Sequence, residues 1–171
     1  MAGYSFSDQE EQIFAKGNFD ICSLQDEIRV DELCQRLLQR FRDDLVHRDY
    51  MPAIQAGALA HGADYFLREF LIPDRHENIF SLRPGRVRQF AGNWYIVRNL
   101  EPNLAELERM LQGIEAFYTW CCQVGKVDAE MAETIRQECS RLDYYRQRID
   151  DFWAIDGDGY EAWERACSLK E

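Results

Sequence analysis

Four arginines between residues 83 and 98 form the part of this sequence best suited to bind another molecule. They lie in the one basic stretch of an acidic chain: residues 73–100 hold five arginines and two acidic residues, whereas the whole chain has a net charge of −11. Arg83 and Arg86 come at the predicted start of a helix, where free backbone amides and guanidinium groups can together bind a phosphate or a carboxylate. The candidate residues for binding an anion or a partner in this stretch are Arg83, Arg86, Arg88, Arg98 and Trp94.

The same arginines have a simpler interpretation as internal ion-pair partners. The predicted helices on either side are acidic, because residues 1–72 hold 13 acidic and 7 basic residues, and residues 101–171 hold 16 acidic and 8 basic residues. Arginines that pair with these carboxylates would stabilise the fold and leave no binding surface. The sequence leaves both interpretations open.

Trp120 is the sixth candidate, from a helix expected over residues 103–124. The aromatic residues Phe117, Tyr118 and Trp120 spread around most of that helix, so Tyr118 lies in the expected core seam while Trp120 points elsewhere. Indole rings are enriched in protein interfaces, and Trp120 therefore marks a second packing surface or a partner site. The simpler alternative is that Trp120 contacts the chain's own tail.

Three histidines supply the material for a third hypothesis, a metal-dependent enzyme. His47, His61 and His76 are scattered, and no two are four residues apart. A composite ligand set would need carboxylates as well, such as Asp64 beside His61 or Glu77 beside His76. We expect histidines at the surface or partly buried, with no metal and no other cofactor.

No further motif predicts catalysis. The turn that begins at Asp156 resembles a calcium loop, but its sixth position is Glu161 and its twelfth is Cys167, where such a loop needs glycine and glutamate. The sequence has no phosphate-binding glycine loop, no Gly-x-Ser-x-Gly elbow and no dinucleotide fingerprint. The carboxylate pairs at 43–44 and 150–151 fall on polar helix faces, where solvation explains them. We therefore expect no catalytic residue.

The cysteines and the apolar runs indicate the environment of the chain. The six cysteines make no Cys-x-x-Cys pair, and we expect them to be reduced core residues. No run approaches the roughly 20 apolar residues that span a bilayer, and residues 1–11 lack the features of a secretory signal. The sequence thus predicts a cytoplasmic protein without a membrane segment.

The apolar periodicity predicts an all-α fold, a single-domain bundle of five or six helices. The expected helices cover residues 23–49, 52–72, 84–98, 103–124 and 128–152. The first is one long helix or two shorter ones with a break near Val30, and residues 93–97 have a strand as the alternative. We expect the helical domain over residues 19–171, after a flexible segment at residues 1–18.

Short links and glycines predict how these helices lie. Only Gly125–Val127 joins the last two helices, which must therefore lie side by side and antiparallel. Gly57 and Gly62 interrupt the apolar stripe of the helix at 52–72 and are expected to mark close contact with another helix.

Three tracts together resemble a known family. They are residues 64–71 (DYFLREFL), residues 82–87 (LRPGRV) at the start of a helix, and residues 107–127, which include IEAFYTW at 114–120. In this order they are similar to the helical core-binding (SAM-like) domain of phage-integrase tyrosine recombinases, over about 65 of the 171 residues.

The resemblance implies a SAM-like arrangement of helices in residues 60–127. In that family this domain clamps DNA, while a separate domain supplies the catalytic tyrosine and arginines. The 171 residues leave no room for such a domain, so the resemblance implies no recombinase activity. The family's DNA-facing helices are basic, whereas the helix at 103–124 carries Glu106, Glu108 and Glu115 against Arg109. The resemblance supports the helical fold more than it supports DNA binding.

From these observations we expect a non-enzymatic intracellular interaction module whose partner is another protein or a second copy of the chain. The alternative is a nucleic-acid-associated module that uses the arginine-rich segment 83–98. DNA binding is disfavoured by the net charge, because the acidic surface repels phosphates. The metal-dependent enzyme is the second alternative, and no membrane partner is expected.

Overall fold

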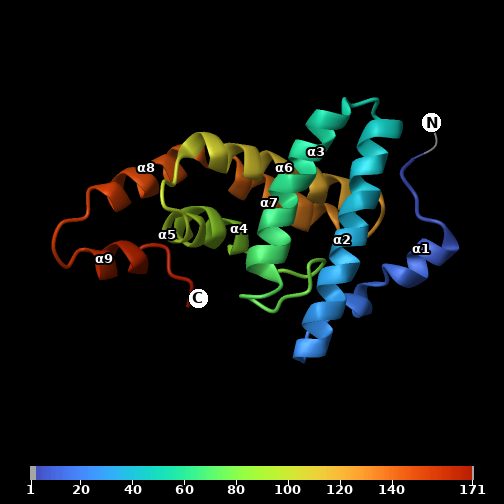
Figure 1. Ribbon diagram of the computed structural model, residues 1–171, viewed down its shortest axis with the longest axis horizontal. Helices are drawn as coiled ribbons and strands as arrows, with labels where there is room; N and C mark the ends of the chain where they lie inside the picture. The colour runs from blue at the N-terminus through green and yellow to red at the C-terminus, as the bar shows by residue number, and fades with distance from the viewer. Residues whose placement is uncertain (1–2, 171) are drawn as a thin grey trace.

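The computed structural model of the protein describes residues 3–170, and every regular element in that range is a helix (Figure 1). The predicted all-α fold is confirmed. The expected bundle corresponds to the helical segments at residues 24–47, 53–71, 86–98, 104–123, 129–139 and 142–153. Residues 1, 2 and 171, which the expected domain limits include, lie outside the described residues.

The first long helix is α2, Leu24–His47, and it is continuous. Ser23 caps it, since the Ser23 side chain accepts a hydrogen bond from the amide of Asp26. The expected alternative of a break near Val30 is wrong, because Val30 lies fully buried inside the helix. Asp31 is not a helix cap: its carboxylate accepts a 2.9 Å hydrogen bond from Arg68.

The second long helix consists of α3, Ala53–Asp64, and the π-helical turn η2, Tyr65–Leu71. It crosses α6, Leu104–Gln123, at two glycines. A Cβ added to Gly62 would lie 2.9 Å from the Met110 Cα, and one added to Gly113 would lie 2.9 Å from the Ala63 nitrogen. The expected close contact is thus present at Gly62, whereas Gly57 faces open space.

Residues 86–98 form one continuous helix made of α4, Arg86–Gln89, the π-helical turn η3, Phe90–Trp94, and α5, Tyr95–Arg98. The strand alternative for residues 93–97 is therefore wrong. The helix begins after Gly85, which has a left-handed φ of 90° and ends the preceding turn, so the start lies slightly later than expected. Phe90 lies at the centre of the core, with its ring 5.2 Å from Phe66 and 5.6 Å from Phe70.

Two helices cover residues 129–153, where one helix over residues 128–152 was expected. They are α7, Ala129–Cys139, and α8, Leu142–Trp153, and both contact α6. The helix is interrupted at Ser140, whose hydroxyl donates to the Gln137 carbonyl, and Arg141 leaves the helical conformation with ψ 48°. The predicted α6 seam is buried, with Leu107, Leu111, Ile114 and Tyr118 all at most 2% exposed.

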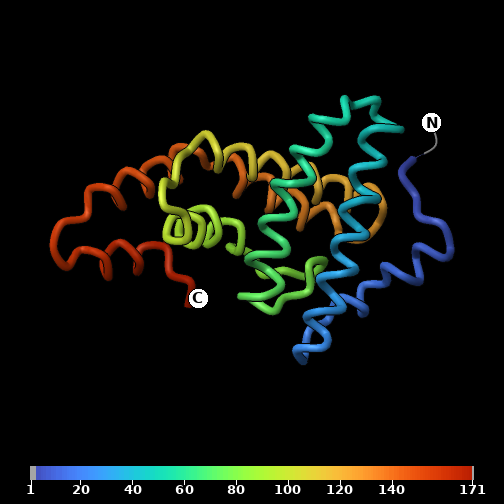
Figure 2. Tube along the Cα trace, in the orientation of Figure 1, coloured from blue at the N-terminus to red at the C-terminus, as the bar shows by residue number. Residues whose placement is uncertain are grey.

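The two ends of the chain return onto the helices, on the side of α2 and on the side of α8 (Figure 2). The segment that we expected to be flexible contains α1, Asp8–Ile13, and is followed by the 3-10 turn η1, Lys16–Phe19. Phe14 and Phe19 are 4% and 0% exposed, so the structure has no domain boundary at residue 18. The segment is held by aromatic rings that are buried against residues far away in the sequence. The local composition, which is mostly polar, does not indicate such burial.

The C-terminal residues are held by polar side chains. After α9, Tyr160–Arg165, the chain runs back along the helix at 86–98. Asn93 donates to the Cys167 carbonyl at 2.8 Å, and Gln89 donates to the Ser168 carbonyl at 3.1 Å. Across residues 3–170, none of the helices combines the length and the apolar character needed to cross a bilayer.

Candidate functional site

The arginine segment is built around a buried ion pair. Arg86 is 6% exposed, and its Nε and Nη2 atoms donate to the same oxygen of Glu77 at 2.9 and 2.6 Å. Its Nη1 atom donates to the side chain of Gln89 at 2.6 Å. The simpler interpretation, internal pairing, describes Arg86, but the carboxylate comes from the loop after η2 rather than from a neighbouring helix.

A second carboxylate occupies the helix start where we expected an external anion. Glu138 of α7 accepts hydrogen bonds from the backbone amides of Gly85 at 3.3 Å and Arg88 at 3.1 Å. Burial raises the pKa of Glu138, and the two amide bonds act in the opposite direction. The local geometry thus suits a carboxylate, as the sequence indicated, and the chain supplies that carboxylate itself.

The other candidates of the segment do not form one surface. Arg88 is half-buried, with Nη1 3.9 Å from the sulfur of Cys167, and Trp94 is 5% exposed. Arg83 has a 75% exposed side chain, 3.5 Å from Glu77, and Arg98 is exposed with its guanidinium 5.2 Å from the Trp94 ring centroid. Arg83 and Arg98 bracket a helix roughly 20 Å long at 1.5 Å per residue. The two exposed arginines are therefore too far apart to hold one small anion.

Trp120 lies in the core, and only a small part of its surface reaches the hollow that Met51 and Ala116 also line. Its ring is 1% exposed and lies 5.4 Å from Phe41 of α2 and 5.7 Å from Phe6 of the N-terminal segment. Its indole N–H donates to Asp44 at 2.9 Å. The chain segment that covers Trp120 is the N-terminal one, and the C-terminal tail contacts other helices.

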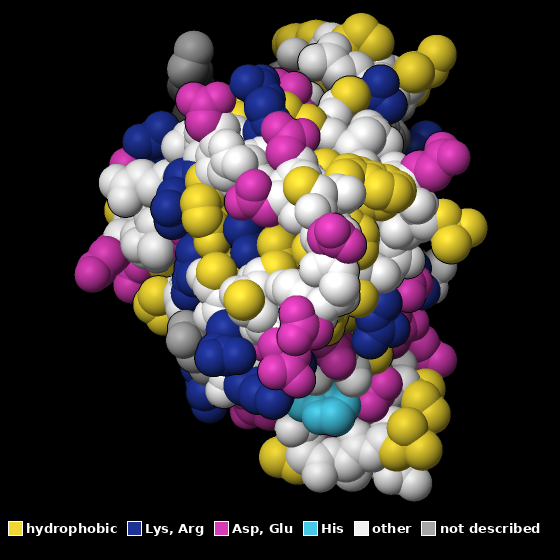
Figure 3. All heavy atoms as spheres, turned by 90° about the vertical axis from the view of Figure 1, so that its left-hand side faces the viewer, with side chains coloured by type: hydrophobic (Ala, Val, Ile, Leu, Met, Phe, Trp, Pro, Cys, Tyr) yellow, Lys and Arg dark blue, Asp and Glu magenta, His cyan; other side chains and the backbone are white. Residues whose placement is uncertain are grey.

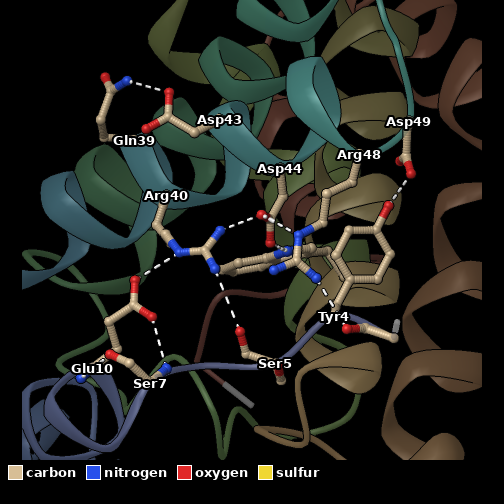
Figure 4. Close-up of polar contacts among 12 residues, drawn as sticks. Tyr4, Ser5, Ser7, Glu10, Gln39, Arg40, Asp43, Asp44, Arg48 and Asp49 are labelled. Carbon is tan, nitrogen blue, oxygen red and sulfur yellow. Dashed lines mark hydrogen bonds and ion pairs between the residues drawn. The ribbon is translucent and has the colours of Figure 1, made fainter. Parts of the chain in front are cut away.

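A buried carboxylate network surrounds that indole (Figure 4). Asp44 is 3% exposed, which corrects the expectation of a solvated face at 43–44, and it forms ion pairs with Arg40 and Arg48. Arg40 also donates to Glu10 at 2.6 Å, so the network joins α1 to α2. Asp43 points away from it and accepts from Gln39 (Figure 4). The network neutralises Asp44 and anchors the N-terminal segment.

Glu10 gives this network an acid dependence. Burial raises the pKa of Glu10, but hydrogen bonds from Ser7 and Arg40 outweigh it, and the net pKa lies below the usual 4.5. The pairing therefore adds stability above pH 4.5, and this stability is lost as the pH falls through the lowered pKa. Glu10→Gln should reduce the free energy of unfolding at pH 7 by up to about 1 kcal/mol and flatten its fall in acid. Denaturant titrations at several pH values test this, and an equal effect of the exposed Glu101→Gln would contradict it.

No family model matches the chain, and neither a curated protein nor a solved structure matches it. The similarity to the core-binding domain of phage-integrase tyrosine recombinases therefore stays a prediction.

The histidines lie apart in the structure as they do in the sequence. His47 and His61 are exposed, and the 57% exposed His76 side chain has its Nε2 atom 3.5 Å from Glu27. Within residues 3–170, no three side chains of histidine, cysteine, aspartate or glutamate converge as metal ligands would.

The cysteines are free thiols, and most are core residues as expected. The buried ones are Cys34, Cys121, Cys139 and Cys167. Burial raises the pKa of the Cys34, Cys121 and Cys139 thiols, which makes these groups poor nucleophiles. Cys22 is exposed and lies before α2, so the core expectation does not hold for this residue.

Large apolar side chains protrude at both ends of α2. Leu24 and Ile28, which the helical pattern placed in the core, are 66% and 56% exposed because the start of α2 extends beyond its neighbours (Figure 1). Tyr50 and Ile54, beside the other end, are 88% and 90% exposed. On the face shown in Figure 3, hydrophobic side chains lie at the upper and lower ends, and the middle mixes hydrophobic side chains with charges of both signs.

Sequence reasoning missed these exposed side chains as candidates. A helical stripe does not reveal where a helix extends past its neighbours, so Leu24 and Ile28 look like core residues. Tyr50 lies in a turn before Pro52, outside any periodic pattern. Its one local signal is a large aromatic residue in the turn between α2 and Pro52, where small or polar residues are common.

Proposed function

We propose that this protein is a non-enzymatic helical module that binds another protein. The observation that carries the proposal is Tyr50, whose backbone has a left-handed φ of 54° and whose side chain is 88% exposed. This conformation costs a residue with a Cβ roughly 1–2 kcal/mol more than glycine. The exposed Tyr50 ring adds no buried surface to the fold, and its backbone conformation costs free energy. A role in binding a partner therefore explains this residue better than a role in stability.

A groove lies next to Tyr50. Its neighbours in sequence, Asp49 and Met51, line a hollow of about 380 Å³ together with Leu59, Ala116 and other residues of α6. The α6 residues that line it run from Gln112 to Gln123, which spans roughly 16 Å at 1.5 Å per residue. A groove of this length suits two to three turns of a partner helix, with small side chains such as Ala116 allowing close approach.

Tyr50→Gly tests this proposal in the full chain. Glycine relieves the left-handed strain, so we expect the free energy of unfolding to stay unchanged or to rise by up to about 1 kcal/mol. The same change should abolish partner binding, because it removes the exposed ring. A denaturant titration measures the first effect. Photo-crosslinking from position 54, in the presence and absence of the Tyr50 ring, measures the second.

The matched control places the same photo-crosslinker at Leu100, which is 97% exposed but far from the groove. We expect one discrete adduct from position 54, lost in the Tyr50→Gly chain, and no such adduct from position 100. If Tyr50→Gly lowers stability by more than about 1 kcal/mol, the ring supports the fold and the proposal loses its basis. Adducts of equal pattern from both positions would also contradict it.

The two alternatives have less support. A nucleic-acid-associated module would use the arginine segment, where Glu77 and Glu138 hold Arg86 and the helix start. A metal-dependent enzyme would have to bring distant histidines together.

A further inference from the structure

The start of α2 carries a second surface, which we call the α2-start face and define by Ile21, Leu24, Glu27, Ile28 and His76. Leu24 and Ile28 are one helical turn apart and more than half exposed, so they form an apolar ridge. Neither side chain has a place in the core of this chain. Solvation of two adjacent large aliphatic side chains is unfavourable, which points to a surface that another molecule covers.

Two hollows lie beside this ridge, one bordered by Leu24 and the other by Ile28. The first, about 340 Å³, is lined by Ile21, Cys22, Ser23, Leu24, Glu27 and His76. The second, about 280 Å³, is lined by Glu27, Ile28, Asp31, Glu32, Arg68, Ile72 and Pro73. Glu27 borders both hollows, so the two are adjacent, and each can take one apolar side chain of a segment that crosses the ridge.

His76, a second residue with a left-handed backbone, lines the first hollow. His76 has a φ of 52°, and its imidazole Nε2 lies 3.5 Å from a carboxylate oxygen of Glu27. The loop is thus held in a conformation that glycine would adopt at lower cost, and the result is an imidazole placed over the edge of the hollow.

Acidic side chains surround the apolar ridge. Asp31 is neutralised locally by Arg68, whereas Glu32 is exposed on the rim of the second hollow. Glu27 borders both hollows and lies 3.5 Å from the His76 imidazole. The whole chain adds a net charge of −11. A second copy would bring the same acidic rim and the same net charge, and a nucleic acid would bring phosphates, so both are repelled.

We propose that the α2-start face binds a basic amphipathic segment of a partner protein. Two apolar side chains of the segment enter the two adjacent hollows beside Leu24 and Ile28, and its lysine or arginine side chains face Glu27 and Glu32. The 24 residues of α2 separate this face from Tyr50 by roughly 36 Å, at 1.5 Å per residue. The module can therefore hold two partners at once, one at each end of α2.

A fluorescent amphipathic peptide of about 18 residues, built from leucine and lysine, is the probe for the full chain. The double variant Leu24→Ala, Ile28→Ala should weaken binding at least roughly tenfold, because it truncates both anchors of the ridge. Both side chains are exposed, so the fold is retained, which circular dichroism and a denaturant titration verify. Glu27→Gln with Glu32→Gln should weaken binding severalfold and reduce its salt dependence.

Ile54→Ala is the control, since it truncates a 90% exposed aliphatic side chain in the first turn of α3, beside the other end of α2. Loss of affinity in this control equal to that in the double variant would overturn the proposal, as would a double variant within about twofold of the wild type. Failure of the lysine peptide to bind, or equal binding of a glutamate–leucine peptide, would overturn the proposal that the partner segment is basic. A reversible dimer of the wild type that the double variant abolishes would assign the face to a second copy instead. None of these outcomes bears on Tyr50, so this inference and the proposed function can fail separately.

Discussion

Gly113→Ala should remove about 3 kcal/mol or more from the free energy of unfolding. A Cβ at this position of α6 would overlap the carbonyl oxygen of Leu59 and lie 2.9 Å from the nitrogen of Ala63. These are backbone atoms of α3, so no side-chain rotation can relieve the overlap, and the two helices would have to separate. The intrinsic gain of about 1 kcal/mol for alanine over glycine in a helix is too small to offset this. A chemical denaturation curve measures the loss.

Gly57→Ala is the control for this prediction. Gly57 belongs to α3, and nothing lies within 4 Å of a Cβ added to it. The alanine should therefore raise the free energy of unfolding by up to about 1 kcal/mol. If Gly113→Ala instead has the same effect as Gly57→Ala, α3 and α6 do not depend on backbone contact at this crossing.

The glycines show what the sequence can and cannot predict about helix contact. Gly57 and Gly62 are five positions apart, which places them about 140° apart around a helix, so both could not face α6. The choice between them depends on which face α6 covers, and only Gly62 lies at the crossing. Gly113 was not singled out, because a glycine in a strongly apolar helix has no local signal for a close approach.

The starts of three helices could be predicted, because a helix cap depends only on adjacent residues. Ser23, Asn103 and Asp128 each accept a hydrogen bond from the amide three residues later, which is a property of the adjacent residues alone. The break between α7 and α8 was missed, because an apolar stripe runs through it and only Ser140 and Arg141 interrupt the backbone.

The candidate site was less predictable than the fold. The arginines were grouped by sequence, but each one's role is set by the carboxylate nearest to it in space. Glu138 comes from a helix some 50 residues further along the chain, and its approach to the helix start has no counterpart in local sequence. Asp44 shows the same limit, since its burial depends on Trp120 of another helix.

Arg86→Ala should lower the free energy of unfolding by about 3–5 kcal/mol. The variant leaves the Glu77 carboxylate, with 12% of its side-chain surface exposed, and the buried Gln89 without the guanidinium that donates to both. A carboxylate left in such a place is unfavourable, because little water reaches it and the exposed Arg83, 3.5 Å away, replaces the lost bonds only in part. A denaturant titration near pH 7 measures the change.

Arg83→Ala is the matched control, because it removes the other arginine that pairs with Glu77. The Arg83 side chain is 75% exposed and 3.5 Å from the carboxylate, so its loss should change stability by less than about 1 kcal/mol. Removing both members of the buried pair, with Arg86→Met and Glu77→Gln, should destabilise less than Arg86→Ala alone, since no buried charge is left behind.

The nucleic-acid hypothesis predicts a different result, in which Arg86→Ala leaves stability nearly intact and abolishes a salt-sensitive affinity for a DNA duplex. Equal, small stability effects of the two single variants, together with such a loss of DNA binding, would replace the internal role of Arg86 with a binding role.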